Sequence, residues 1–177
     1  MSYLPALIES LRFLARAGAS SIVMACDSAY VDIQNLRSHV SVPLINLPQI
    51  VIRSISQQYE PCRIGLLAAP AVLESKLYTA PLQALGFDVV IPSPKVQVKV
   101  EHAIYDPKNG IKACQSSSQP QRLLNVAIKS LERKRVKAII LGCTDIPTVR
   151  MYSRVPLVDP AIICARYILH STKKRFK

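Results

Sequence analysis

Short apolar runs rich in Val, Ile and Leu alternate along the chain with stretches in which apolar residues recur at helical spacing. This alternation is typical of a parallel sheet whose strands are connected by helices, so it predicts an α/β fold. We expect strands at residues 21–25, 44–47, 62–68, 87–91, 138–141 and 156–158. We expect helices at residues 5–17, 31–40, 49–58, 72–85, 96–105, 120–134, 146–152 and 161–170, and a loop at 106–119.

The chain also contains an internal repeat. A predicted helix leads into Ser21-Ile-Val-Met-Ala-Cys26, which is followed by Val-Pro-Leu-Ile-Asn at 42–46. Much later, a second predicted helix leads into Ala138-Ile-Ile-Leu-Gly-Cys143, which is followed by Val-Pro-Leu-Val-Asp at 155–159. The same order of elements in both halves indicates two pseudo-equivalent lobes. We expect residues 1–58 with 159–177 to form the first lobe and residues 59–158 to form the second.

Composition adds constraints on the class of protein. A hydrophobic fraction of 50% in 177 residues is ample for a packed core. No apolar run approaches the roughly 18 residues that a membrane helix needs, and no basic segment precedes an apolar stretch at the N-terminus. We therefore expect a cytoplasmic protein without a membrane partner.

The cysteines and histidines argue against a disulfide scaffold and against a bound metal. The five cysteines are odd in number, widely spaced and without a Cys-x-x-Cys pair. His39, His102 and His170 each lack a second ligand at helical spacing. The sequence therefore predicts no metal site.

The formal net charge of +12 raises the question of nucleic-acid binding. Much of the excess lies at residues 122–137 and at the C-terminus. In the first segment the cations alternate with apolar residues at helical period, which is typical of the solvated face of an amphipathic helix. No nucleic-acid motif accompanies them, so we expect surface charge and not a nucleic-acid partner.

Cys26 and Cys143 each follow a predicted strand, which gives them a distinctive place. Ligands of open parallel sheets bind beyond the carboxyl ends of strands, where the N–H groups of the next helix favour both a thiolate and a substrate carboxylate. Most free cysteines are small buried apolar residues, and we expect that role for Cys62, Cys114 and Cys164. Packing does not require the same residue at two equivalent strand ends, so the repeat favours a functional pair.

The segment Ala25-Cys26-Asp27-Ser28-Ala29-Tyr30 resembles the first cysteine motif of the aspartate/glutamate racemase family, usually Ala-Cys-Asn-Thr-Ala-His. Leu141-Gly142-Cys143-Thr144-Asp145-Ile146-Pro147 resembles the second, usually Leu-Gly-Cys-Thr-Glu-Leu-Pro. Ile104-Tyr105-Asp106 with Lys108 and Gly110 resembles an Ile-Tyr-x-x-Ile-Lys-x-Gly element of the family. The resemblance covers essentially the whole chain and implies two flavodoxin-like lobes with parallel sheets.

The resemblance implies racemisation of a small acidic amino acid, aspartate or glutamate, by a homodimer that needs neither pyridoxal phosphate nor any other cofactor. Inversion requires a base on one face of Cα and an acid on the other, and the resemblance assigns these roles to Cys26 and Cys143. It makes Ser28 and Thr144 the donors to the α-carboxylate. It makes Lys108 a candidate for the distal carboxylate, although an ordinary exposed lysine in a turn explains Lys108 equally well.

Departures from the family pattern leave a second interpretation open. The match begins one strand and one helix after the usual family start, so we expect a truncated first lobe whose two-stranded sheet has an unpaired edge. Asp27 stands at a substrate-binding position where the family has an amide, and an ionised carboxylate there would repel the substrate. Residues 68–72 lack the two threonines of the family's Ala-Thr-x-Gly-Thr segment. The alternative is a catalytically inactive remnant or a small-anion binding module.

Overall fold

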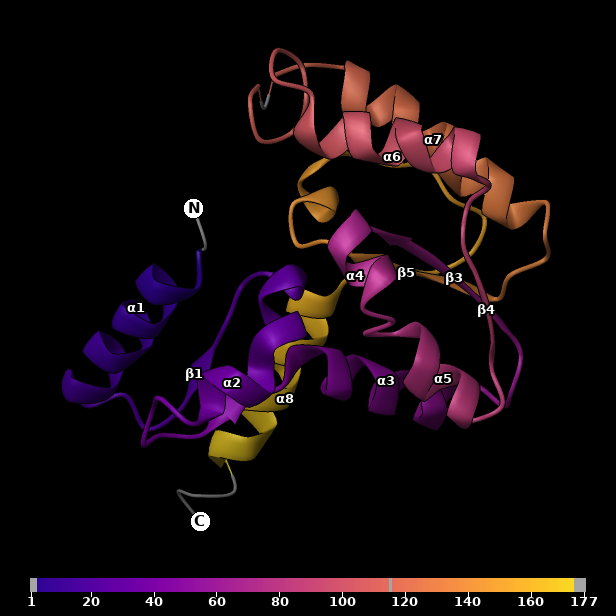
Figure 1. Cartoon of the computed structure of the whole chain (residues 1–177). Helices are drawn as coiled ribbons and strands as arrows, with labels where there is room; N and C mark the ends of the chain where they lie inside the picture. The colour runs from indigo at the N-terminus through magenta and orange to yellow at the C-terminus, as the bar shows by residue number, and fades with distance from the viewer. Residues whose placement is uncertain (1–2, 115, 174–177) are drawn as a thin grey trace.

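The structure is a computed structural model that describes residues 3–114 and 116–173. The basic C-terminal residues 174–177 lie outside the described residues. Two parallel sheets organise the chain (Figure 1). The smaller sheet pairs β1 (Ile22–Val23) with β2 (Leu44–Ile45). The larger has the order β4 (Asp88–Val90), β3 (Arg63–Ala68), β5 (Ala138–Gly142) and β6 (Leu157–Val158).

Helices connect the strands in the order that the sequence predicts. α1 (Leu4–Arg16) precedes β1, and η1 (Asp27–Asp32) with α2 (Ile33–Arg37) connects β1 to β2. The remaining elements are α3 (Leu47–Gln58), α4 (Pro70–Glu74), α5 (Thr79–Ala84), α6 (Pro94–Tyr105), α7 (Gln119–Glu132), η2 (Ile146–Thr148) and α8 (Pro160–Lys173). The α/β class with parallel sheets is thereby confirmed.

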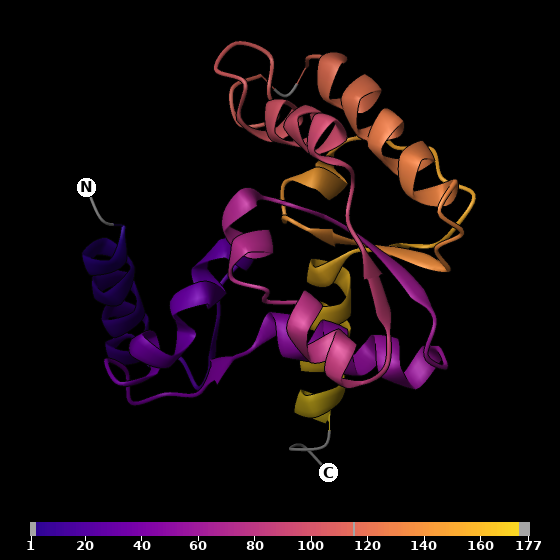
Figure 2. The same ribbon diagram turned by 45° about the vertical axis from the view of Figure 1, so that its right-hand side comes forward.

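The four-stranded sheet has helices on both faces. α6 and α7 cover one face, and α3, α5 and α8 cover the other (Figures 1 and 2). Every residue of β5 is buried, as expected of a strand with two covered faces. Because side chains alternate along a strand, Ile139 and Leu141 join the core beneath α6 and α7. Ile140 joins the core on the opposite face, which continues to Ile22 of the small sheet.

The internal repeat is visible in the hydrogen bonds. The N–H of Ile22 in β1 donates to the carbonyl of Pro43 at 3.0 Å, and the N–H of Ile139 in β5 donates to the carbonyl of Pro156 at 2.9 Å. Both bonds join a strand that is followed by one of the two cysteines to the next Val-Pro-Leu segment. The two halves therefore pair their strands in the same way.

The caps of the following helices repeat as well. The side chain of Asn46 accepts a hydrogen bond from the N–H of Gln49 at the start of α3. The side chain of Asp159 accepts one from the N–H of Ala161 at the start of α8. These side chains stabilise two equivalent helix starts, and α3 and α8 then lie against each other (Figure 1).

Two predicted helices differ in the structure. The expected helix at 72–85 is divided into α4 and α5, because Lys76 adopts a left-handed φ of 55° and the intervening turn directs Tyr78 into the interior. The expected helix at 146–152 is only the short 3-10 turn η2. Neither break has a Gly or Pro at the point where the helix stops, so no helix-breaking residue in the sequence indicated these two breaks.

Among the described residues, no helix combines the length and the apolar character that crossing a membrane requires.

Candidate functional site

The ends of β1 and β5 meet where the two sheets adjoin. Cys26 follows β1 and precedes η1, whereas Cys143 follows β5. The hydroxyl of Thr144 donates a hydrogen bond to the carbonyl of Ala25 at 2.9 Å. This bond joins the residues directly adjacent to the two thiols. The structure therefore brings the predicted pair to one junction, with Cys26 exposed and Cys143 only 9% exposed.

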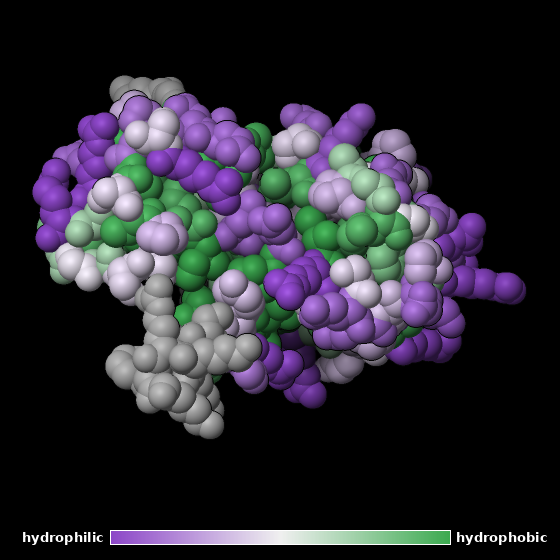
Figure 3. All heavy atoms as spheres, turned by 90° about the horizontal axis from the view of Figure 1, so that it is seen from below, coloured by the Kyte–Doolittle hydropathy of each residue, from purple (hydrophilic) through white to green (hydrophobic). Residues whose placement is uncertain are grey.

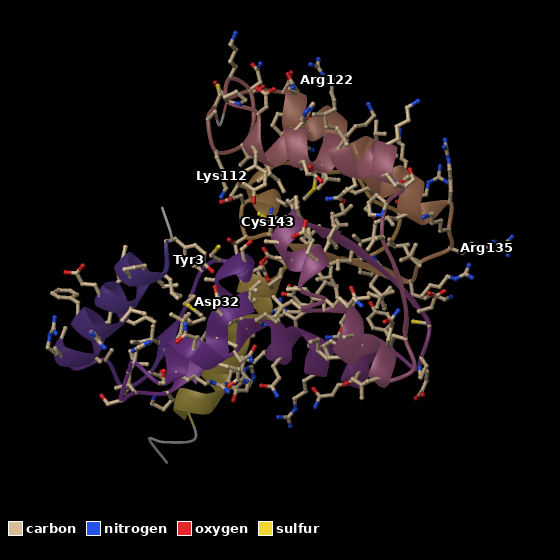
Figure 4. The ribbon with its side chains drawn as sticks, viewed as in Figure 1. Tyr3, Asp32, Lys112, Arg122, Arg135 and Cys143 are labelled. Carbon is tan, nitrogen blue, oxygen red and sulfur yellow. The ribbon has the colours of Figure 1, made fainter. Side chains whose placement is uncertain are left out.

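A charged cluster surrounds Cys143. Its Sγ lies 3.8 Å from Oδ2 of Asp145, to which the thiol donates. The same Oδ2 lies 3.4 Å from Nζ of Lys112, and that ammonium stands 5.1 Å from the ring centroid of Tyr105. Figure 4 shows Lys112 and Cys143 on the same side of the molecule, with Lys112 coming from the loop after α6.

These neighbours act on the protonation of Cys143 in opposite directions. Burial raises the pKa of the Cys143 thiol to about 11, while the backbone N–H of Asp145 lowers it. The carboxylates of Asp145 and Asp27 raise this pKa further, and the ammonium of Lys112 lowers it. Cys143 is consequently a protonated thiol at neutral pH, with a cation nearby that can partly compensate a thiolate.

Tyr105 lies within electrostatic range of both thiols. Burial raises the pKa of its phenol, Lys112 lowers it, and negative charge at Cys143, Cys26 and Asp145 raises it. The pKa of Tyr105 thus depends on charges at the ends of both β1 and β5. This supports a single site at the junction.

Asp27 does not lie at the surface of this site. Its side chain is 1% exposed, and its Oδ1 accepts a hydrogen bond of 2.5 Å from the hydroxyl of Tyr78. Oδ2 is buried and has no hydrogen-bond partner among the described residues. Burial raises the pKa of Asp27 to about 6, against the lowering effect of the Tyr78 bond. The structure therefore encloses Asp27 instead of presenting a carboxylate that would repel the substrate.

The other expected substrate-binding residues, Ser28, Thr144 and Lys108, lie in different environments. Ser28 is half-buried in η1, and its hydroxyl makes no hydrogen bond within the described part of the chain. The hydroxyl proton of Thr144 is engaged by Ala25, so it is not free for a carboxylate in this arrangement. Lys108 is exposed, and its backbone N–H donates to Oδ1 of Asp106 in the turn after α6.

Sequence reasoning missed Lys112, which is the lysine that the structure brings to Asp145 beside Cys143, whereas Lys108 was the lysine proposed for the distal carboxylate. The chain after α6 folds back, so that the N–H of Ile111 donates to the carbonyl of Ala103 and that of Lys112 to the carbonyl of Ile104. Gly110 permits this return, since a Cβ there would lie 2.6 Å from the backbone nitrogen of Asp106. Gly110 was the sequence signal for this fold-back, because a residue without a Cβ lets the two backbone segments approach closely.

The start of α1 is also tied to the site. The hydroxyl of Tyr3 donates to Oδ2 of Asp32 at 2.5 Å, and Figure 4 shows the two side chains near each other. This bond raises the pKa of Tyr3 to about 12. Within residues 3–114 and 116–173, no group of three His, Cys, Asp or Glu side chains is arranged to hold a metal ion.

Comparison with known proteins places this geometry in context. The profile of the Asp/Glu/Hydantoin racemase family matches residues 2–168. A glutamate racemase of Desulforudis audaxviator is 27% identical over 164 residues, which are 87% of this chain and 56% of that protein. The chain thus spans just over half the length of this curated relative.

Solved structures show the same fold. An aspartate racemase homologue from Pyrococcus horikoshii superposes with a TM-score of 0.74 at 21% identity, over 96% of this chain and 74% of that one. The aspartate racemase of Picrophilus torridus gives a TM-score of 0.74 at 21% identity, over 93% of this chain and 68% of that one.

Proposed function

The chain belongs to the Asp/Glu/Hydantoin racemase family, and from that membership we propose that it racemises aspartate or glutamate with Cys26 and Cys143 as the acid and base. The observation that carries the proposal is the Thr144 to Ala25 hydrogen bond, which joins the neighbours of both thiols. The substrate class follows the names of the relatives, which are glutamate and aspartate racemases.

The proposed reaction moves two protons. A thiolate on one face of Cα removes the α-proton, and the electron pair of the broken C–H bond is delocalised into the α-carboxylate. The thiol on the opposite face then donates its proton to Cα, which inverts the stereocentre. The roles of the cysteines exchange with the direction of reaction.

The surroundings suggest which groups assist each step. Ser28, whose hydroxyl makes no hydrogen bond within the described residues, is the candidate donor to the α-carboxylate at the start of η1. Lys112 would stabilise a thiolate at Cys143 when that residue acts as base. Asp145 would hold the thiol form in the opposite direction, since Sγ donates to its carboxylate.

The test is exchange of the α-proton of aspartate and glutamate with deuterated solvent, followed by NMR. We expect Cys26→Ser and Cys143→Ser each to abolish exchange. Cys62→Ser is the matched control, because Cys62 is a half-exposed thiol at the start of β3, outside the site. Exchange by either site variant at the wild-type rate would remove that cysteine from the mechanism.

Two lysines compete for the distal carboxylate of the substrate. Lys112 is the better candidate, because its ammonium already accompanies a carboxylate, that of Asp145, beside Cys143. Lys108 is the candidate that the family resemblance implies. We expect Lys112→Gln to raise KM for aspartate or glutamate at least tenfold, which corresponds to the loss of about 1.4 kcal/mol of binding. Lys108→Gln is its matched control, and the reverse ranking would restore Lys108.

We also propose that the protein is a homodimer. β1 has one strand neighbour in the described sheets, and a free strand edge favours association. Apolar side chains of α1 are exposed nearby, with Phe13 at 62% and Leu14 at 42%. Light scattering should give about twice the mass of one chain, and a compact monomer would contradict the dimer.

A second candidate function, small-anion binding, rests on an open groove between α3 and α8. Its volume is about 450 Å³, and its lining includes Arg53, Arg166 and His170. Neither helix contains an Asp or Glu, and neither arginine has a carboxylate partner among the described residues. Figure 1 shows α3 and α8 in the lower part of the molecule, and on the face seen from below in Figure 3 hydrophilic side chains interrupt the apolar ones.

Calorimetry with inorganic pyrophosphate tests this function. We expect binding that weakens with salt and is lost in the double variant Arg53→Gln, Arg166→Gln. Arg122→Gln, on the exposed side of α7, is the control. Equal binding by both variants would mean that the excess charge acts without a defined site.

A further inference from the structure

The segment that carries Cys26 is held from three directions. The hydroxyl of Tyr30 bonds both the N–H of Met24 at 2.9 Å and its carbonyl at 3.0 Å. One residue on, the carbonyl of Ala25 accepts from Thr144. On the far side of Cys26, the side chain of Asp27 accepts from Tyr78.

Two of these bonds cross between the sheets. Thr144 follows β5, and Tyr78 lies between α4 and α5, so both belong to the part built around the four-stranded sheet. Ala25 and Asp27 follow β1 of the small sheet. Cys26 is thus bracketed by two hydrogen bonds that fix the end of one sheet against the other.

The Asp27 to Tyr78 bond is the buried member of this pair. Tyr78 has no exposed surface, and Asp27 has 1%. The hydroxyl of Tyr78 donates to Oδ1, whereas Oδ2 has no donor in the part of the chain that the structure describes. An ionised carboxylate in this position would leave at least one oxygen unsatisfied and without water, which is costly.

Among the described residues, no cation acts on Asp27 to compensate a negative charge. The titratable groups that act on it or that it acts on are Tyr78 before α5, Tyr30 in η1, Asp159 before α8 and Cys143 after β5. All are neutral or acidic. Burial accordingly raises the pKa of Asp27 to about 6 and that of Tyr78 well above its usual value.

We propose that Asp27 and Tyr78 are positioning residues that lock the Cys26 segment against the larger sheet, and that Asp27 does so as a neutral carboxylic acid. Loss of its proton leaves a buried charge, which favours release of the side chain toward water and so loosens the segment. The lock itself does not depend on the proposed racemase activity. The effect of the lock on the spacing of the two thiols matters for catalysis only through the proposed racemase function, so this part of the inference rests on that function.

Hydrogen exchange of the peptide spanning residues 22–32, measured by mass spectrometry, tests the lock without any turnover. After correction for the intrinsic exchange rate, we expect protection in the wild-type protein to fall about tenfold between pH 5 and pH 7.5. This factor follows from a carboxyl with a pKa of about 6 when locked and 3.8 when released.

Two variants separate the proton from the hydrogen bond. Asp27→Asn keeps an oxygen that accepts from Tyr78 but cannot ionise, so its protection should not change with pH. Tyr78→Phe removes the donor and should lower protection at both pH values. Tyr152→Phe, at a 59% exposed tyrosine, controls for loss of a hydroxyl and should behave as wild type.

The outcomes are decisive in both directions. A wild-type protein whose protection is constant with pH, or an Asp27→Asn variant that keeps the wild-type decline, would overturn the proposal. The α-proton exchange of the cysteine variants is measured separately. An inactive protein with the expected pattern of hydrogen exchange would therefore retain the lock and lose only the proposed function.

Discussion

The hydroxyl of Thr144 and the carbonyl of Ala25 form a 2.9 Å hydrogen bond between residues that stand 119 apart in the sequence. Each is the immediate neighbour of one of the two cysteines. The bond therefore links the two strand ends directly. It also uses the hydroxyl that the family resemblance would assign to the substrate.

Thr144→Val should cost about 1 kcal/mol of unfolding free energy, because it removes one neutral hydrogen bond at nearly unchanged volume. Thr144→Ser keeps the donor and should remain close to wild type. Urea unfolding of the three proteins measures the difference. Equal midpoints for Val and wild type would show that the bond does not persist in solution.

The stability of the wild-type protein should depend on the proton of Asp27. The pKa is raised from 3.8 to about 6 on folding, so the folded state holds the proton more tightly than the unfolded state. This contribution is fully present below pH 3.8 and is lost as pH rises through about 6. The loss amounts to about 3 kcal/mol.

Asp27→Asn should abolish that dependence. The comparison is urea unfolding of both proteins at pH 4.5 and pH 7.5, since the other titrating groups are common to the two. The unfolding free energy of the Asp27→Asn variant, relative to that of the wild-type protein, should rise with pH. Parallel pH profiles would contradict a raised pKa at Asp27.

Cys143 should be alkylated slowly at neutral pH, with a rate that climbs toward pH 11, because burial and the carboxylate of Asp145 favour the thiol. Asp145→Asn should shift this profile to lower pH, since it removes charge but keeps the backbone N–H. Lys112→Gln should shift it to higher pH. Iodoacetamide labelling, quantified on the peptide that contains Cys143, follows each profile; opposite shifts would refute this electrostatic arrangement.

Gly110→Ala should displace the turn that carries Lys112. A Cβ at this position would lie 2.6 Å and 2.7 Å from the backbone nitrogen and oxygen of Asp106, and backbone atoms cannot move aside cheaply. We expect a destabilisation of about 1–3 kcal/mol in urea unfolding together with a higher pH profile for alkylation of Cys143. Lys108→Ala, in the same turn, should change neither quantity. A Gly110→Ala protein with both properties of wild type would show that the turn does not set Lys112.

The sequence by itself determined the α/β class, the positions of the strands and the repeat that makes Cys26 and Cys143 equivalent. These features are local or periodic. A buried parallel strand is a continuous apolar run, and the two Val-Pro-Leu segments form the same hydrogen bonds at Pro43 and Pro156 because their local sequences match.

Only the tertiary structure decided which side chains surround the thiols. Lys108 and Lys112 are alike by sequence, and the fold-back after α6 brings Lys112 to Asp145. From the sequence, Asp27 is expected to face the substrate as a carboxylate. In the structure, the break between α4 and α5 turns Tyr78 toward Asp27, and the two side chains form a hydrogen bond. Such contacts join residues that are distant in the chain, so their geometry depends on how whole elements pack and leaves no periodic trace in the sequence.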